Sequence, residues 1–143
     1  SNRIESYAVP FAVHLFPNGI DSVFNLNDGL NTGESRWTSY NNNDVIQNPW
    51  VQYDFPMEVT VNSTIISWYD DGGGVVKPDG VSVLYWVDND WVEVNITNTE
   101  KNGLDWTIYF DPLTVTKIRL SIDNSKTNKA AGITEWLLFN DDE

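Results

Sequence analysis

The stretch Trp50-Val-Gln-Tyr-Asp-Phe55 decides how the chain is expected to fold, because apolar and polar side chains alternate along it. In an extended strand successive side chains point to opposite faces, so Val51, Tyr53 and Phe55 share one face. The two polar residues between them share the other face. The stretch therefore predicts a β-strand that is buried on one side and meets water on the other.

Further runs rich in β-branched and aromatic residues follow this stretch, between clusters of Gly, Asn, Asp and Pro. The runs are Val59–Tyr69, Val81–Val87, Trp91–Ile96, Trp106–Phe110, Lys117–Ile122 and Ile133–Phe139. Asp88-Asn-Asp90 separates two of them and predicts a tight hairpin turn. No segment of helical length is amphipathic, and only Ser22–Leu26 is expected to form a short turn. Short strands at even spacing predict an all-β, antiparallel sandwich or barrel.

The length and the ends of the chain bear on its organisation. A length of 143 residues predicts one domain over residues 1–143. The chain begins with Ser1-Asn2 and not with Met, so we expect a domain cut from a longer protein. The expected tails are Ser1–Ser6 and Asn140–Glu143. No apolar run approaches the roughly 18 residues of a membrane-spanning helix, so we expect no membrane insertion.

The charge of the chain narrows the classes of partner. The sequence holds 21 acidic and 8 basic residues, for a formal net charge of −13 at pH 7. Nucleic acids and anionic membranes require a positive surface, so we expect neither as a partner. The chain has no cysteine, which excludes disulfides, thiolate metal ligands and a cysteine nucleophile.

The residues needed for catalysis are sparse. His14 is the one histidine, and its apolar neighbourhood favours a structural role over that of a general base. Asp70 and Asp71 are adjacent, so in a strand their carboxylates point to opposite faces and do not form the pair that glycoside hydrolysis uses. The run Gly72–Gly74 lacks the lysine and the helix of a phosphate-binding loop. We therefore expect no catalytic site in this chain.

Long segments without strand patterns are the candidate binding loops. They are Asp28–Asn48, Asp70–Asp79, Asn98–Asp105 and Asp123–Gly132. Loops of this length in a compact β domain are usually either functional or disordered. Aromatic rings stack on the apolar faces of sugar rings, and planar polar groups bond sugar hydroxyls. The carbohydrate-binding candidates are Arg36, Tyr40, Trp68, Asp70 and Asp71. Five tryptophans lie in or at the start of predicted strands and are expected to belong mainly to the core: Trp50, Trp86, Trp91, Trp106 and Trp136.

Residues 25–37 form a loop that is dense in oxygen-bearing side chains and is turned by two glycines. Hard cations such as calcium prefer carboxylate, carbonyl and hydroxyl oxygens, and flexible loops of this kind supply them. The spacing of the acids is not that of an EF-hand. The alternative is a loop of Asx turns that holds no ion.

Several motifs follow one another in a fixed order along the chain. They are Asp21–Gly29, Arg36-Trp-Thr38, Trp50–Phe55, Trp68–Gly74 and Ala131-Gly-Ile-Thr-Glu-Trp136. The ordered set covers nearly the whole chain and resembles the galactose-binding-like, discoidin or coagulation-factor type C domain. It is most similar to carbohydrate-binding module family 32, of the kind appended to bacterial glycoside hydrolases. The resemblance implies a jelly-roll β-sandwich of about eight antiparallel strands.

The resemblance also implies a structural calcium ion near the place where the ends of the chain meet. The implied ligands are the Asn25 carbonyl, the Asp28 carboxylate, the Leu30 carbonyl, the Ser35 hydroxyl and carbonyl, the Thr134 carbonyl and the Glu135 carboxylate. The gap between Asp28 and Ser35 is longer than in the family pattern. Asn31 or Gly33 is therefore an alternative to Leu30 as the carbonyl donor.

Sugar sites in this family lie on loops at one edge of the sandwich, which correspond here to Trp37–Pro49, Asp70–Pro78 and Asp123–Ala131. No histidine falls in these loops, so galactose recognition by the usual His-Arg set is not expected. The resemblance predicts a non-catalytic, calcium-holding carbohydrate-binding module of a larger glycoside hydrolase. Its partners would be an oligosaccharide or polysaccharide and the catalytic domain of the same chain, at the surface, in the periplasm or outside a bacterial cell. The alternative is a structural or protein-interaction β-sandwich that packs against a catalytic domain and binds no sugar.

Overall fold

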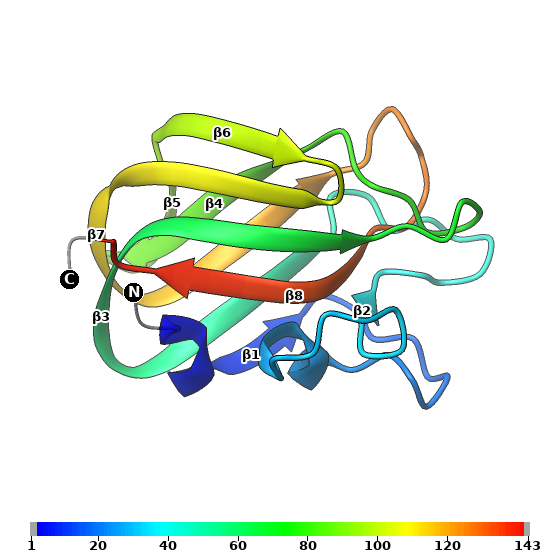
Figure 1. Cartoon of the computed structure of the whole chain (residues 1–143), viewed down its shortest axis with the longest axis horizontal. Coiled ribbons are helices and arrows are strands. Elements are labelled where there is room, and N and C mark those ends of the chain that lie inside the picture. Colours follow the sequence, from blue (N-terminus) through cyan, green and yellow to red (C-terminus); the bar gives the residue numbers. More distant parts are fainter. Residues whose placement is uncertain (1–2, 142–143) are drawn as a thin grey trace.

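The computed structural model describes residues 3–141, which form an all-β fold of eight antiparallel strands (Figure 1). The strands are β1 (Val9–Ala12), β2 (Trp37–Thr38), β3 (Trp50–Tyr69), β4 (Gly80–Val87), β5 (Asp90–Glu93), β6 (Ile96–Asn102), β7 (Asp105–Asp123) and β8 (Gly132–Phe139). Their hydrogen-bonded order is β2-β8-β3-β7-β4-β5, with β1 beside β3 and β6 beside β7. The predicted fold class, an all-β antiparallel sandwich, is confirmed.

The long strands β3 and β7 pair along most of their length. Each of them joins two runs that the sequence predicted separately. Within β3 the register of the pair shifts between Asp54 and Val59, and this segment contains Pro56. Proline cannot donate to the hydrogen-bond ladder and is tolerated at such irregularities. The interruption in the sequence pattern is therefore a break in pairing and not the end of a strand.

The two long strands belong to both layers of the sandwich. The first part of β3 and the last part of β7 form one layer with β1, β4 and β5. The last part of β3 and the first part of β7 form the other layer with β2, β6 and β8. Figure 1 shows β6 and β8 in front of β4 and β5. The core lies between the layers, and Val51, Tyr53 and Phe55 are buried in it, as their alternation predicts.

β6 is one of three strands that the sequence did not predict, together with the short β1 and β2. The prediction of a loop over Asn98–Asp105 is wrong, because residues 98–102 pair with β7 through their backbone. The side chains of β6 are polar and exposed almost throughout, so this edge strand carries no hydrophobic alternation. The tight hairpin predicted at Asp88–Asp90 is confirmed. Asp88 and Asn89 take φ of 53° and 61°, the left-handed conformation that a two-residue hairpin turn requires.

Two short 3₁₀ helices accompany the strands, η1 (Ile4–Tyr7) and η2 (Val23–Asn27). η2 matches the turn expected at Ser22–Leu26. Ser22 caps it, since its hydroxyl accepts a hydrogen bond from the Phe24 amide at 3.2 Å. None of the helices in residues 3–141 is long and apolar enough to span a membrane.

The prediction of tails at both ends is wrong for the part that the structure describes. Glu5 in η1 is fully buried, and Asn140 after β8 is buried as well. The side chain of Glu5 accepts a hydrogen bond from the Leu138 amide at 2.8 Å, which joins η1 to β8. Residues 1–2 and 142–143 of the predicted tails lie outside the described residues.

The long connections gather at one end of the sandwich, on the right in Figure 1, and we call it the loop end. The segments are 13–22, 39–49, 70–79 and 124–131. Backbone hydrogen bonds join the last three: the Ser39 amide donates to the Ala131 carbonyl at 2.8 Å, and the Val76 amide donates to the Ala130 carbonyl at 3.0 Å. The loop end is therefore a single connected surface on a rigid scaffold.

Candidate functional site

A cavity of about 280 Å³ opens at the loop end, and we call it the loop cavity. Its walls come from segments 13–22, 39–49 and 70–79, from the loop before β2, and from β2 and β3. The lining residues are Phe16, Asn18, Asp21, Arg36, Thr38, Tyr40, Tyr69, Asp71, Gly74 and Val75. Three of the five carbohydrate-binding candidates, Arg36, Tyr40 and Asp71, thus share one cavity.

Tyr40 forms an aromatic wall of the loop cavity. Its ring meets the ring of Phe16 edge to face, with centroids 5.0 Å apart and planes at 88°. Gly74 packs directly against this ring, since a Cβ atom at Gly74 would lie 3.0 Å from Tyr40 Cε1. His14 also contacts the backbone of this residue, because its Nε2 lies 3.0 Å from the Tyr40 carbonyl oxygen. The Tyr40 ring is therefore held in place while it stays partly exposed.

Arg36 is fixed by contacts on three sides. Its Nη1 donates to the Gly33 carbonyl at 2.6 Å, and its Nε lies 3.3 Å from Asp21 Oδ1. The guanidinium carbon lies 4.7 Å from the centre of the Tyr69 ring. Asp21 is buried and also accepts a hydrogen bond from the Thr38 hydroxyl. A planar donor with this support can bond a ligand without first losing much side-chain entropy.

Asp70 and Asp71 are adjacent in sequence but line different cavities. Their side chains therefore diverge, as the sequence predicts. Asp71 lines the loop cavity, and its Oδ1 accepts the amides of Gly73 and Val75 at 2.8 and 3.1 Å. Its Oδ2 takes no part in these bonds. Asp70 lines a second cavity of about 240 Å³, and its two oxygens accept the amides of Gly72 and Lys77. Those two backbone bonds lower the pKa of Asp70.

Trp68 does not offer the stacking surface that the sequence suggested. Its side chain is 2% exposed, and its ring packs edge to face against Trp106 at 5.1 Å. The aromatic residue that reaches the loop cavity from this strand is Tyr69, on the opposite face. Alternation along β3 would have identified it, since Ile66 and Trp68 point inward. Phe16, the other aromatic residue missed, lies in a segment with no distinguishing pattern.

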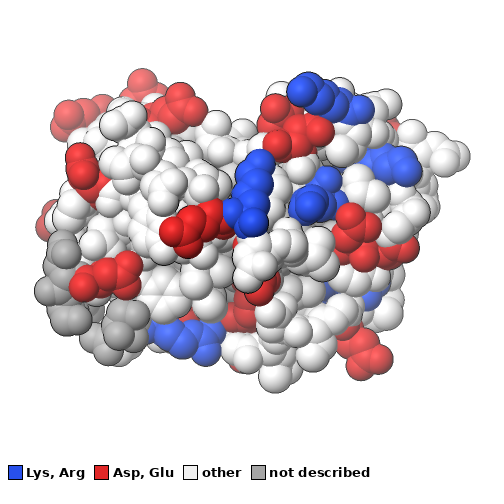
Figure 2. Space-filling model, turned by 45° about the horizontal axis from the view of Figure 1, so that its top comes forward, with Lys and Arg blue, Asp and Glu red and all other residues white. Residues whose placement is uncertain are grey.

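Charge is distributed unevenly over the surface. Figure 2 shows basic side chains gathered toward the loop end on the right, among acidic ones. Lys77, Lys126 and Lys129 belong to the loops of this end and are exposed. They offset nearby carboxylates, including Asp70 and Asp123. The loop end is therefore less acidic than the net charge of −13 suggests.

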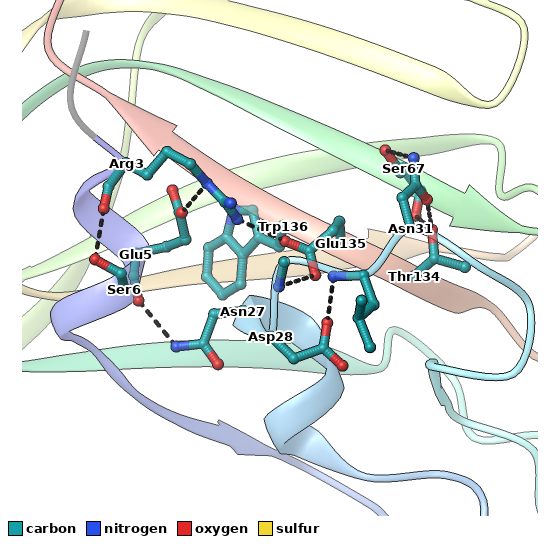
Figure 3. Close-up of polar contacts among 12 residues, drawn as sticks. Arg3, Glu5, Ser6, Asn27, Asp28, Asn31, Ser67, Thr134, Glu135 and Trp136 are labelled. Carbon is teal, nitrogen blue, oxygen red and sulfur yellow. Dashed lines mark hydrogen bonds and ion pairs between the residues drawn. The ribbon is translucent and has the colours of Figure 1, made fainter.

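A second group of polar residues lies where η1, the loop after η2 and β8 meet (Figure 3). Glu135 is only 4% exposed; its Oε1 accepts the Gly29 amide at 3.2 Å and its Oε2 accepts Arg3 Nη2 at 3.0 Å. Asp28 accepts the Leu30 amide at 2.8 Å and the hydroxyl of Ser35. Burial, a hydrogen bond with Asp28 and the charge of Asp28 raise the pKa of Glu135 to about 8.

This donor set fits a hard divalent cation. The buried Glu135 carboxylate lies beside the exposed Asp28 carboxylate, their charges repel, and a cation between them would remove the repulsion. Asp28, Ser35 and Glu135 supply the carboxylate and hydroxyl oxygens that calcium prefers. The described residues contain no group of three or more His, Cys, Asp or Glu side chains placed to hold a metal. The remaining ligands would therefore be backbone carbonyls.

The other predicted ligands could contribute only through their backbone. The Asn25 side chain donates to the carbonyls of Ile20 and Arg36 at 3.1 and 2.7 Å, so it ties the loop together. The Thr134 hydroxyl donates to the side chain of Asn31 and to the Ser67 carbonyl. The Leu30 side chain is exposed.

Arg3 is a part of this group that the sequence did not reveal. Its guanidinium donates to Glu5 at 2.9 Å and to Glu135 at 3.0 Å, so it joins two buried carboxylates. Both Arg3 and Glu5 fall in the predicted tail, which is why they were missed. Asn27 adds a further link, because its amide donates to the Glu5 carbonyl at 2.9 Å.

Comparison with known families gives one match that covers most of the chain. The model described as NedA-like, galactose-binding domain, of the F5/F8 type C type, matches residues 25–120. No curated protein sequence matches the chain at a significant level.

Solved structures resemble the chain over nearly its full length. One comes from the Streptococcus pneumoniae beta-galactosidase BgaA, with a TM-score of 0.82 and 16% identity over 93% of this chain and 90% of that chain. The family 32 carbohydrate-binding module of C. perfringens NanJ, in complex with galactose, has a TM-score of 0.74 and 19% identity over 95% and 96%. The CBM32 of AlyQ, in complex with 4,5-unsaturated mannuronic acid, has a TM-score of 0.66 and 22% identity over 97% and 96%. At these identities the likeness establishes the fold.

Proposed function

Because the chain belongs to the NedA-like galactose-binding domains of the F5/F8 type C family, we propose that it is a non-catalytic carbohydrate-binding module. The observation that carries the proposal is the loop cavity, in which a fixed aromatic wall and fixed planar polar groups face one space. Complexes of NanJ with galactose and of AlyQ with an unsaturated mannuronic acid add support, since both modules share this fold.

Binding in the loop cavity would combine stacking with hydrogen bonds. A sugar ring would lie against Tyr40, where its C–H groups meet the aromatic face. Arg36 would donate to sugar hydroxyls, and the Oδ2 atom of Asp71 would accept from them. A volume of about 280 Å³ is near the lower limit of small-molecule sites, roughly 300 Å³. It suits one terminal sugar better than the interior of a chain.

A structural calcium ion would act on this cavity from a distance. Held by Asp28, Ser35 and Glu135, it would tie the loop before β2 to β8. Arg36 follows Ser35 directly, so the position of its backbone depends on that tie. The ion would supply positive charge to its oxygen ligands, and its role would be structural and not catalytic.

The module would serve a larger enzyme by holding it on its substrate. A linked catalytic domain then meets the polysaccharide at a raised effective concentration, even when each sugar binds weakly. We propose a bacterial glycoside hydrolase that works in the periplasm, at the cell surface or outside the cell as the parent protein.

The test is calorimetric titration with a panel of monosaccharides and oligosaccharides, in the presence of calcium. The wild type should bind one class of sugar, and Tyr40→Ala should abolish that binding without lowering the melting temperature. Tyr109→Ala is the matched control, because Tyr109 is a partly exposed aromatic residue on β7 that does not line the loop cavity. Absence of binding to every sugar would favour the alternative, a β-sandwich that packs against a catalytic domain.

A further inference from the structure

The outer face of the layer β1-β3-β7-β4-β5 carries three tryptophans that the sequence assigned to the core. Trp50, Trp86 and Trp91 are partly exposed. Together with Arg119 and Gln52 they form what we call the indole face. This face lies on the strands themselves, apart from the loop cavity, and shares no residue with it.

Arg119 lies between two of the indoles. Its guanidinium carbon is 3.8 Å from the centre of the Trp50 ring and 4.2 Å from that of Trp91. Gln52 is its partner in the register, and Gln52 Oε1 accepts a hydrogen bond from Arg119 Nε at 3.0 Å. The guanidinium therefore fixes the orientation of both rings and covers one side of each. Cation–π contacts of this kind keep flat rings ordered on an exposed surface.

Trp86 extends the row. It pairs with Trp91 across the β4–β5 hairpin, and the two rings meet at 5.3 Å and 65°. Trp50 stands on β3, and Trp91 stands three strands away on β5. Since Arg119 lies 3.8 and 4.2 Å from the centres of the Trp50 and Trp91 rings, those two centres are at most about 8 Å apart, and Trp86 adds a third ring 5.3 Å from Trp91. The three rings together present more aromatic surface than one sugar ring covers, which suits neighbouring sugars of a chain.

The charges on this face balance, unlike those of the whole chain. Lys117 lies 3.8 Å from Asp54, and the register places Arg119 and Glu93 on either side of Leu84. Two cations and two carboxylates therefore stand on a face of a protein whose net charge is −13. Burial lowers the pKa of Arg119, and the charge of Asp54 raises it. A neutral chain would meet no net repulsion there.

We propose that the indole face binds the interior of a neutral polysaccharide chain, as a second surface beside the loop cavity. The inference rests on the proposed carbohydrate-binding function and deepens it. The indoles would stack on sugar rings, while the N–H groups of Arg119 that do not bond Gln52 would donate to sugar hydroxyls. The loop cavity would hold one sugar, and the indole face would add affinity that grows with chain length.

The experiment is a length series. Affinity electrophoresis in soluble galactan, galactomannan and mixed-linkage glucan identifies the polymer that retains the wild type. Calorimetry then follows oligosaccharides of that polymer, from the monosaccharide to the hexasaccharide. Two variants test the indole face: Trp91→Ala, and Trp91→Leu, which keeps an apolar side chain in case the alanine variant folds poorly. Tyr40→Ala tests the loop cavity. Tyr109→Ala is the control, on the layer opposite the indole face.

The two surfaces predict different results. Both Trp91 variants should bind the hexasaccharide about tenfold more weakly and keep the wild-type affinity for the monosaccharide. Tyr40→Ala should lose the monosaccharide and keep residual affinity for the polymer. An unchanged gain of affinity with length in both Trp91 variants overturns the proposal and leaves the carbohydrate-binding function standing. Absence of binding by the wild type to any sugar or polymer overturns both.

Discussion

The ring of Tyr53 stacks on the ring of Trp136, with centroids 3.9 Å apart and planes at 10°, and its hydroxyl donates to the Trp136 carbonyl at 2.8 Å. The contact joins β3 to β8 at the centre of the core. Both side chains are fully buried. Tyr53 therefore contributes both ring packing and a buried hydrogen bond, and point variants can separate the two contributions.

Tyr53→Phe should lower the free energy of unfolding by about 1 kcal/mol, because it removes the hydrogen bond and keeps the stacked ring. Tyr53→Ala should lower it by about 3–5 kcal/mol, because it also leaves a cavity. Urea denaturation measures both. Tyr109→Phe on the outer surface is the control and should change stability by less than about 0.5 kcal/mol. Equal losses for the two Tyr53 variants would contradict this division.

Arg36→Lys should weaken sugar binding roughly tenfold and leave the melting temperature nearly unchanged. Lysine keeps a positive charge beside Asp21, but it cannot also bond the Gly33 carbonyl and lie flat on Tyr69. Arg36→Ala should lower the melting temperature as well, because it leaves the buried Asp21 carboxylate without its cation. Titration with the best sugar and thermal denaturation check both. Wild-type affinity in Arg36→Lys would show that the guanidinium does not contact the sugar.

Removal of calcium should lower the melting temperature, and addition of calcium should restore it. An ion that binds only the folded state at a hundred times its dissociation constant adds about 2.7 kcal/mol. Glu135→Gln should abolish this response. In chelator the variant should melt no lower than the wild type, because Gln resembles the protonated carboxyl that the raised pKa of Glu135, about 8, favours at neutral pH.

Asp71→Asn is the control for this experiment, since Asp71 lies in the loop cavity and not beside Glu135. It should keep the full response to calcium. If chelator left the melting temperature of the wild type unchanged, the calcium site would be ruled out. Arg3 would then be the cation that balances the buried carboxylates of Glu5 and Glu135.

Asp70 should make stability depend on acid pH. Hydrogen bonds from the Lys77 and Gly72 amides lower its pKa below the usual 3.8, so the ionised form stabilises the folded loop. That contribution is complete above the usual value and is lost as the pH falls through the lowered one. The wild type should therefore melt above Asp70→Asn at neutral pH, and the difference should vanish in strong acid. A difference that stays constant from pH 2 to pH 7 would contradict this assignment.

The alternating stretches were enough to predict the sandwich and much of its core. Val51, Tyr53 and Phe55 are buried as their spacing requires. The edge strand β6 escaped prediction because the backbone pairing that makes it a strand leaves no trace in exposed polar side chains. The burial of Glu5 escaped for a related reason: its partners, Leu138 and Arg3, are known only once η1 has docked on β8.

The candidate site could be predicted only in part. Loop residues Arg36, Tyr40 and Asp71 do meet in one cavity, since the loops that carry them emerge at the same end. Trp68 and Asp70 do not, because a single step along an extended chain reverses the direction of a side chain. The same rule explains Trp50, which alternates with Val51 and so shares the outer face with Gln52. Its hydrophobicity suggested the core, and its position in the alternation was the better guide.

Because β3 and β7 belong to both layers, neither half of the sandwich can exist without the other. A chain cut in the middle of either strand would leave two pieces, each with half of its hydrogen-bond ladder open. Folding must bring together segments far apart in sequence, such as Tyr53 and Ile118, before any layer is complete. Such topologies fold in roughly milliseconds to seconds and in one cooperative step. One layer therefore cannot unfold while the loop end stays folded. The binding surfaces of the domain form and are lost together.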